Sequence, residues 1–228
     1  MNEDLDHNER LQVIYGDLPL PDEEFEALLD KSLSPRGPDS LLDKAGAWGL
    51  SADMHVLDIG CRDARYAVEL ARRYGCTVLA VDPLDDHIRR AQKLVQDHPD
   101  VQNKITIRKG RIEDIPAEDA SVDFIWCRDV LSHIPDLPRG LAECRRVLTP
   151  GGRMLVYQTF ATELLEAREA TYLANALAVI PENQAPFFFE QVAYAAGFRI
   201  QEVDRIGSEW REHWEETGAA ITSNQLLR

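Results

Sequence analysis

Basic residues are scarce in this chain, which has 25 lysines and arginines against 40 aspartates and glutamates and a formal net charge of −15. Nucleic-acid binding draws much of its affinity from basic side chains that displace counterions. The few basic clusters, such as residues 87–93, fall in stretches with helical spacing and are typical of solvated helix faces. The balance of charge therefore disfavours a nucleic acid as substrate.

Long apolar runs and paired cysteines are also absent. No stretch approaches the roughly 18–20 apolar residues that a membrane-spanning helix needs. The N-terminal sequence MNEDLDHNER is acidic, whereas a secretory signal is basic and then apolar. The four cysteines form no CxxC pair, and none of the six histidines stands at ligand spacing from a cysteine or aspartate. These features predict a cytoplasmic protein with no membrane span and no metal centre.

Short apolar runs alternate with helical patterns from residue 54 onward. Apolar runs bounded by turn residues predict buried strands, and apolar residues at a spacing of three and four predict helices. The predicted strands span residues 55–60, 76–82, 104–110, 121–127, 153–160 and 199–206. This alternation is typical of βαβ units, so we predict an α/β fold: a Rossmann-like, doubly wound, mostly parallel sheet with helices on both faces.

Helical additions are expected before the first strand and after the fifth. Residues 1–14 are polar and are expected to be irregular, and short helices are predicted around 23–31 and 40–48. Trp210 and Trp214 would dock the C-terminal tail or a second subunit, so a homodimer is one expectation. The predicted parts are an N-terminal helical cap (1–50), the Rossmann-like core (51–160), an inserted lid-like helix (161–185) and the rest of the core with a helical tail (186–228).

An acidic residue ends the second predicted strand at a distance expected of a ribose-binding group. Asp82 lies 22 residues after Gly60, and an acid about 20 residues beyond such a glycine turn is placed to hold two ribose hydroxyls. The chain has neither GxGxxG, which cradles a pyrophosphate, nor the phosphate loop GxxxxGK[ST]. NAD-dependent oxidoreductases are therefore disfavoured. A cofactor with a ribose but no phosphate is favoured, and S-adenosylmethionine is the common one.

Four stretches resemble, in order and spacing, the motifs of class I S-adenosylmethionine-dependent methyltransferases. VLDIGCRDARYAVELA (56–71) resembles the first motif, VLDIGCGxGxxxxxLA, and AVDPL (80–84) resembles the acidic second-strand motif. Residues 110–136 resemble the adenine-side loop, fourth strand and following turn, and residues 141–159 resemble the helix, Pro-Gly-Gly turn and fifth strand. The resemblance covers residues 54–160 and is nearest to the type 11 methyltransferases of small molecules. It implies S-adenosylmethionine as cofactor and methyl transfer to an O, N or C atom of a small molecule.

The resemblance also implies which residues hold the cofactor. These are Asp58, Gly60 and Cys61 for the methionine moiety, Asp82 for the ribose, Pro83, Ile112 and Glu113 for the adenine, and Cys127 and Arg128 beneath the sulfonium end. Three positions depart from the family pattern. Arg62 and Ala64 replace two glycines of the first motif, and Arg111 stands where the family often has an acid. A protein that keeps the fold and binds an adenosyl ligand without catalysis is the alternative function.

His133 is the candidate catalytic residue, because it follows the fourth strand at the mouth of the expected pocket and histidine titrates near neutral pH. The alternative role is that of a structural histidine in the LSHIPD turn. The chain has CRDV where methylases of base or glutamine amino groups resemble [DNS]PP[YF], and it lacks the paired residues of cytosine and protein-arginine methylases. A small-molecule substrate is therefore expected.

Overall fold

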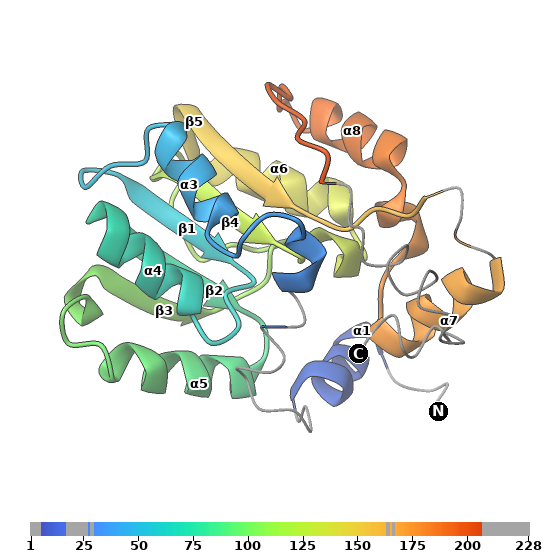
Figure 1. Ribbon diagram of the computed structural model, residues 1–228, viewed down its shortest axis with the longest axis horizontal. Helices are drawn as coiled ribbons and strands as arrows, with labels where there is room; N and C mark the ends of the chain where they lie inside the picture. The colour runs from blue at the N-terminus through green and yellow to red at the C-terminus, as the bar shows by residue number, and fades with distance from the viewer. Residues whose placement is uncertain (1–5, 17–26, 28–29, 163–164, 166, 207–228) are drawn as a thin grey trace.

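A five-stranded, all-parallel sheet in the order β3-β2-β1-β4-β5 forms the centre of the computed structural model (Figure 1). The structure describes residues 6–16, 27, 30–162, 165 and 167–206. The strands are β1 His55–Ile59, β2 Thr77–Asp82, β3 Ile105–Lys109, β4 Val122–Arg128 and β5 Leu148–Tyr157. The α/β fold and five of the six predicted strands are thereby confirmed, and the strand order reverses between β1 and β4, as in a doubly wound sheet.

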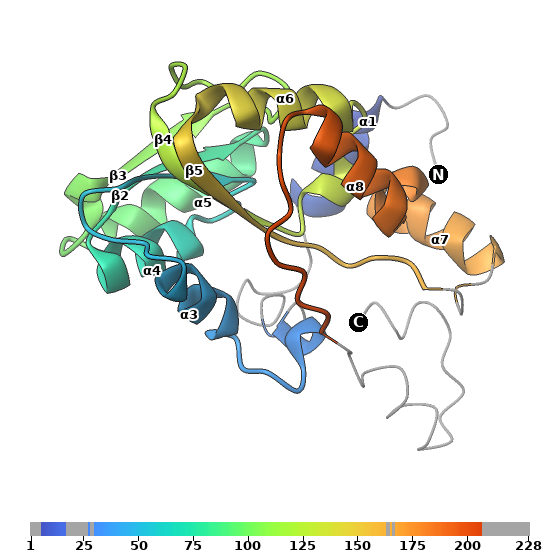
Figure 2. The same ribbon diagram turned by 90° about the horizontal axis from the view of Figure 1, so that it is seen from above.

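The strands are apolar on both faces because helices cover both. Leu57 of β1 pairs in register with Leu79 of β2 and with Ile125 of β4, and Leu57 is fully buried. Helices α3 (Ser40–Ala47), α4 (Arg65–Tyr74) and α5 (Asp85–Gln96) pack on one face, whereas α6 (Leu137–Val147) and α8 (Pro186–Ala195) pack on the other (Figure 2). Burial on both faces accounts for the continuous apolar runs in the sequence.

Local signals fix the ends of these helices. An αL residue, Gly75, ends α4 at a φ of 73°, a conformation that glycine adopts without a steric penalty. The Asp136 side chain caps α6 by accepting a hydrogen bond from the Arg139 N–H. Helix α6 ends at Val147, three residues before Pro150, and β5 begins at once with an irregular register opposite Val122 and Phe124.

The N-terminal segment is helical, and the expectation of an irregular start at 1–14 is wrong for its described part. Helix α1 (His7–Leu11) continues into a π-helical turn (Gln12–Gly16), and both lie beyond the carboxyl ends of the strands beside α7 (Ala167–Leu177) (Figure 1). Contacts with distant elements hold it there, which local periodicity does not encode. Gln12 Nε2 donates to Asp86 of α5 at 2.6 Å, and the Tyr15 hydroxyl donates to the Leu177 carbonyl at 3.1 Å.

Short 3-10 turns complete the described structure, at Lys31–Leu33, Gln102–Lys104, Leu131–His133 and Pro181–Gln184. The helix predicted at 23–31 lies mostly outside the described residues, as do Trp210 and Trp214 of the tail. In the part of the chain that is described, no helix is both long and apolar enough to cross a membrane. Among α8 aromatics, Phe187 is 71% exposed whereas Phe188 packs against the core.

The sixth strand predicted at 199–206 is wrong. These residues pair with no described strand, and all but Ile200 and Ile206 are exposed. Their acidic side chains make contacts other than ladder bonds: Glu202 accepts from Lys44 Nζ at 2.6 Å, and Asp204 accepts from both terminal nitrogens of Arg36 at 2.6 and 2.7 Å. Ion pairing to α3 and its preceding loop therefore takes the place of sheet extension.

Candidate functional site

The loop after β1 lies at the point where the strand order reverses. A Cβ on Gly60 would collide with the Val130 side chain from the β4 side, and Gly60 has a φ of 73°. Arg62 and Ala64 also have positive φ, at 49° and 64°. The left-handed region costs a non-glycine residue roughly 1–2 kcal/mol. The two positions at which the chain departs from the family glycines are therefore positions where the backbone favours glycine.

Asp82, at the end of β2, is fixed in place by three hydrogen bonds. Its Oδ1 accepts from the Leu84 N–H at 3.0 Å and lies 2.9 Å from His87 Nδ1, and its Oδ2 accepts from the Arg62 N–H at 3.0 Å. The side chain therefore bridges the loop after β1 and the start of α5, and it is only 4% exposed. This is the position that the spacing from Gly60 predicts, and it holds both loops in one arrangement.

Three buried carboxyl groups converge near this loop: Asp58, Asp63 and Asp82, which are 2%, 7% and 4% exposed. Burial, followed by the charges of Asp63 and Asp82, raises the pKa of Asp58 to about 8. The Asp58 Oδ2 is buried with no hydrogen-bond partner among the described residues. Asp58 therefore holds its proton near neutral pH, and a ligand with positive charge would favour its ionised form.

A cavity of about 270 Å³ opens beside the ends of β2 and β3. It is lined by Pro83, Leu84, Lys109, Gly110 and Arg111. Pro83 is thus where an adenine-packing residue is expected, and four further lining residues were not assigned from the sequence.

The other two residues predicted to contact the adenine, Ile112 and Glu113, do not line this cavity. Ile112 is 3% exposed and packs in the core that contains α6, and Glu113 forms an ion pair with Arg111 at 3.3 Å. The Glu113 carbonyl oxygen accepts from Arg139 Nε at 2.9 Å. Neither side chain lines the cavity, so any contact of theirs with an adenine stays a prediction.

The two predicted site cysteines are neutral thiols. Cys61 is 6% exposed and Cys127 is fully buried, and burial raises the pKa of each well above its usual value. A neutral buried thiol is a small apolar group rather than a nucleophile. Among the described residues, no group of three histidine, cysteine, aspartate or glutamate side chains is arranged to hold a metal ion.

Arg128, the last residue of β4, lies between two tyrosine rings. Its guanidinium carbon is 4.9 Å from the centre of the Tyr66 ring and 5.8 Å from that of Tyr157. The side chain is 6% exposed, and its Nη2 donates to Asp30 Oδ1 at 2.8 Å. Tyr66 in turn stacks on Trp126, with ring centres 5.2 Å apart. A buried cation thus lies at the β4 side of the site, opposite the acidic cluster.

His133 lies under the N-terminal cap and the end of α7. Its Nδ1 is 3.3 Å from the Ala178 carbonyl oxygen, and the Tyr15 ring meets it edge-on with centres 5.4 Å apart. Burial lowers the pKa of His133 to about 4, with a smaller contribution from His7. His133 is therefore neutral at pH 7, as a general base must be, but its low basicity weakens proton transfer. Its catalytic role stays a prediction.

His87, Asp63, Tyr66 and Asp30 contribute to the site but were not found from the sequence. A single histidine or tyrosine inside a helical pattern carries no signal of its own. Asp63 could have been found, because it stands in the first motif next to the replaced glycines. Asp30 comes from a segment far from the motifs in sequence, so only the fold brings it to Arg128.

Comparisons with known proteins find similarity to methyltransferases. Residues 57–156 match the family model described as a methyltransferase domain. The chain is 27% identical over 176 residues to the mitochondrial ubiquinone biosynthesis O-methyltransferase of Homo sapiens, covering 72% of this chain and 47% of that protein. It is 33% identical over 106 residues to the sarcosine/dimethylglycine N-methyltransferase of Halorhodospira halochloris, covering 46% and 38%. The chain thus spans less than half the length of either relative.

A solved structure shares the fold. The geranyl diphosphate methyltransferase in complex with SAM superposes with a TM-score of 0.66 and 16% identity, covering 90% of this chain and 77% of that one. At that level of identity the similarity supports the Rossmann-like fold and nothing more specific.

Proposed function

We propose that this chain is an S-adenosylmethionine-dependent methyltransferase that acts on an O, N or C atom of a small molecule, because its residues 57–156 match the methyltransferase domain model. The observation that carries the proposal is the cluster of Asp58, Asp63 and Asp82 beside the cavity at the end of β2. S-adenosylmethionine, when bound, supplies a methyl group on a cationic sulfonium, and its transfer leaves a neutral thioether. A site with excess buried negative charge suits such a cation.

The residues fit this cofactor in distinct ways. Asp82 presents a fixed carboxylate for the ribose hydroxyls, and Pro83 walls the cavity proposed for the adenine. Gly60 and Cys61 supply the loop backbone, and the unpartnered Asp58 carboxyl would become negatively charged when the sulfonium binds near it. We keep Ile112, Glu113 and Cys127 as proposed contacts or supports of this site.

We further propose that the acceptor lies between this site and His133, under α1 and α7. Methyl transfer depends largely on holding the acceptor at near-attack distance. The cap formed by α1 and α7 covers that edge of the sheet, and Arg10 Nη2 of α1 donates to the Ala174 carbonyl of α7 at 3.5 Å. His133 would accept the proton of a hydroxyl acceptor, whereas an amine acceptor would need no base at this position.

The alternative is a binding protein without methyl transfer, and the position of Arg111 is the observation in its favour. Arg111 lines the proposed adenine cavity and stands where the family often has an acid. Its side chain is 41% exposed and is paired with Glu113, so it can turn outward without breaking a buried network. Arg111→Ala would strengthen cofactor binding if the side chain obstructs the cavity.

The test is calorimetric titration with S-adenosylmethionine and S-adenosylhomocysteine. We expect micromolar binding that Asp82→Asn weakens at least tenfold. Asp43→Asn is the matched control, because Asp43 is an aspartate of α3 that does not line the cavity and whose side chain is 71% exposed. Equal binding by the wild type and by Asp82→Asn would reject the ribose assignment, and no binding by the wild type would reject the cofactor.

The cytoplasmic location and the homodimer remain predictions. Light scattering of the purified chain tests the second, since a mass near twice the 25.8 kDa of one chain is expected.

A further inference from the structure

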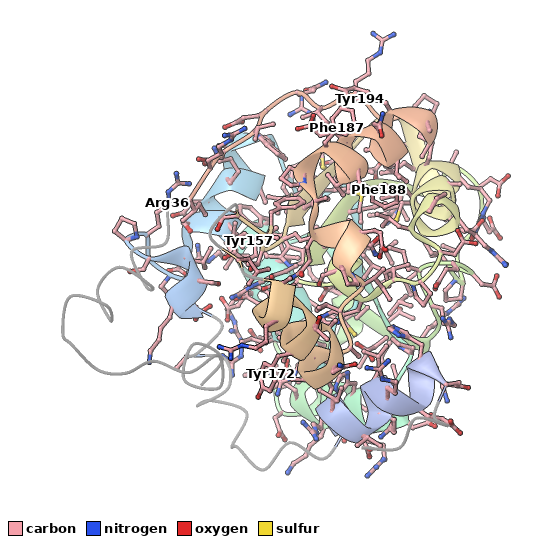
Figure 3. The ribbon with its side chains drawn as sticks, turned by 90° about the vertical axis from the view of Figure 1, so that its right-hand side faces the viewer. Arg36, Tyr157, Tyr172, Phe187, Phe188 and Tyr194 are labelled. Atoms are coloured by element: carbon pink, nitrogen blue, oxygen red, sulfur yellow. The ribbon has the colours of Figure 1, made fainter. Side chains whose placement is uncertain are left out.

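We propose that Arg128 binds a carboxylate group of the acceptor, so that the methylated small molecule is a carboxylic acid. This inference rests on the proposed methyltransferase function and assigns Arg128 to the acceptor instead of the sulfonium end of the cofactor. Figure 3 shows Tyr157, one of the two rings beside Arg128, toward the middle of that view, whereas Phe187 and Tyr194 of α8 lie near its edge. The guanidinium lies at the carboxyl end of β4, in register with Tyr157 at the end of β5.

Arg128 has more hydrogen-bond donors than its neighbours use. Its Nε and Nη1 are buried with no hydrogen-bond partner among the described residues, although the side chain is only 6% exposed. Buried donors are normally satisfied, because leaving them unpaired costs stability. Asp129 Oδ2 is the other acid nearby, at 3.7 Å from Nε, beyond hydrogen-bonding distance. The guanidinium is therefore incompletely satisfied at a place where a ligand is expected.

The chain already places one carboxylate on this guanidinium. Asp30 Oδ1 accepts from Nη2 at 2.8 Å, and the Asp30 side chain is 25% exposed. Within the described part of the chain, the Asp30 carboxylate makes no second hydrogen bond or ion pair, and it caps no helix end. A single bond from a partly exposed side chain is easily exchanged, so Asp30 acts as an internal stand-in for the acceptor's carboxylate.

Planar geometry favours a carboxylate as the anion. Arginine presents parallel N–H groups that match the two oxygens of a carboxylate, and the two tyrosine rings leave the edge of the guanidinium as the direction of approach. Asp30 and Asp129 already supply two negative charges around one arginine. An incoming anion must therefore replace Asp30 rather than join it.

The placement of charge favours the acceptor over the cofactor as the source of this carboxylate. The proposed cofactor contacts of β1 and β2 are acidic, with Asp58 and Asp82 at the ends of those strands. Arg128 is flanked by β5, through Tyr157, and by the N-terminal segment, through Asp30, as well as by Tyr66 at the start of α4. Of these elements, β5 and the N-terminal segment lie outside the β1–β2 loops that form the proposed cofactor site.

The experiment titrates S-adenosylhomocysteine-loaded protein with three acids (acetate, benzoate and 4-hydroxybenzoate) and with their amides. We expect at least one acid to bind the wild type at least tenfold more tightly than its amide. Arg128→Met should abolish this difference, and Asp30→Asn should strengthen binding of the acid at least threefold by removing the internal competitor. Asp204→Asn is the matched control, because it breaks the exposed pair with Arg36 and should change nothing.

Three results would overturn the proposal. One is that no acid binds better than its amide. Another is that Asp30→Asn weakens binding of the acid, which would make Asp30 part of the binding site. The third is that Arg128→Met weakens S-adenosylhomocysteine but not 5′-methylthioadenosine, which lacks the carboxylate; Arg128 would then hold the cofactor. Failure of the proposed function gives a different result, because the wild type would then not bind S-adenosylhomocysteine. In that case the acids and amides are titrated into the protein without S-adenosylhomocysteine. Circular dichroism confirms that each variant is folded.

Discussion

Binding of S-adenosylmethionine should release a proton from Asp58. The pKa of Asp58 is raised from 3.8 to about 8, mainly by burial and then by the charges of Asp63 and Asp82. At pH 7 a carboxyl group with that pKa is about nine-tenths protonated. A cation bound nearby favours the ionised form and lowers the pKa. We therefore expect about 0.9 proton to be released per cofactor bound at pH 7, and about 0.1 at pH 9.

Calorimetry in two buffers with different heats of ionisation measures this number directly. S-adenosylhomocysteine lacks the sulfonium charge and should release fewer protons. The affinity for S-adenosylmethionine should rise by a factor approaching ten per pH unit below pH 8, as Asp58 becomes ionised. Asp58→Asn should abolish both effects, whereas Asp53→Asn, at an exposed aspartate, should preserve them. The same proton release at pH 7 and pH 9, or in Asp58→Asn, would refute the reasoning.

Three further predictions concern stability and the cofactor loop. The pKa of His133 is lowered from 6.5 to about 4 in the folded state, so its contribution to the free energy of unfolding is present above pH 6.5 and is lost as the pH falls from 6.5 to 4. The pKa of Asp58 is raised instead, so its contribution to the free energy of unfolding falls as the pH rises from about 4 to 8. The two effects cancel below pH 6.5, so urea unfolding should show that the free energy of unfolding declines mainly between pH 6.5 and 8. In Asp58→Asn only the His133 effect remains, so this variant should lose stability as the pH falls below 6.5. A wild type that is equally stable at pH 6.5 and 8 contradicts this prediction. Gly60→Ala should cost about 2 kcal/mol or more in urea unfolding and remove cofactor binding, because of its positive φ and the collision of a Cβ; Gly37→Ala, with open space around the Cβ, should do neither. His87→Asn should weaken S-adenosylmethionine binding about tenfold in calorimetry, because it removes the contact of His87 Nδ1 with Asp82 and a hydrogen bond to a charged group contributes about 1.5–3 kcal/mol. Unchanged binding would show that the Asp82 carboxylate needs no support from His87.

The sequence predicted the sheet well because each core strand carries its own signal. β1 and β2 are continuous apolar runs that end in an acid or a glycine turn, and burial on both faces demands such runs. Residues 199–206 instead intersperse apolar and polar side chains, as an edge strand can, yet their acidic side chains pair with Lys44 and Arg36. An edge strand and an extended, ion-paired segment have the same local pattern, so only the tertiary contacts separate them.

Part of the candidate site can be predicted from the sequence, and part of it depends on tertiary contacts. Gly60 and Asp82 follow from spacing, because the loops after neighbouring parallel strands must meet at one edge of the sheet. The contact between Asp30 and Arg128 joins residues 98 positions apart. No periodicity encodes such a pair, since its partners are chosen by the path of the N-terminal segment. The raised pKa of Asp58 likewise depends on Asp63 and Asp82 arriving beside it.

Charge is distributed across this site in a way that the overall composition hides. In a chain with a net charge of −15, the loops after β1 and β2 hold three buried carboxyl groups, while the end of β4 holds a buried arginine. A cation is favoured on the first side and an anion on the second. In the proposed reaction, methyl transfer would remove the sulfonium charge and weaken attraction on the first side. Because the charged groups on both sides are buried, salt should screen either attraction little, so a strong salt dependence of acid binding would place the acid away from Arg128.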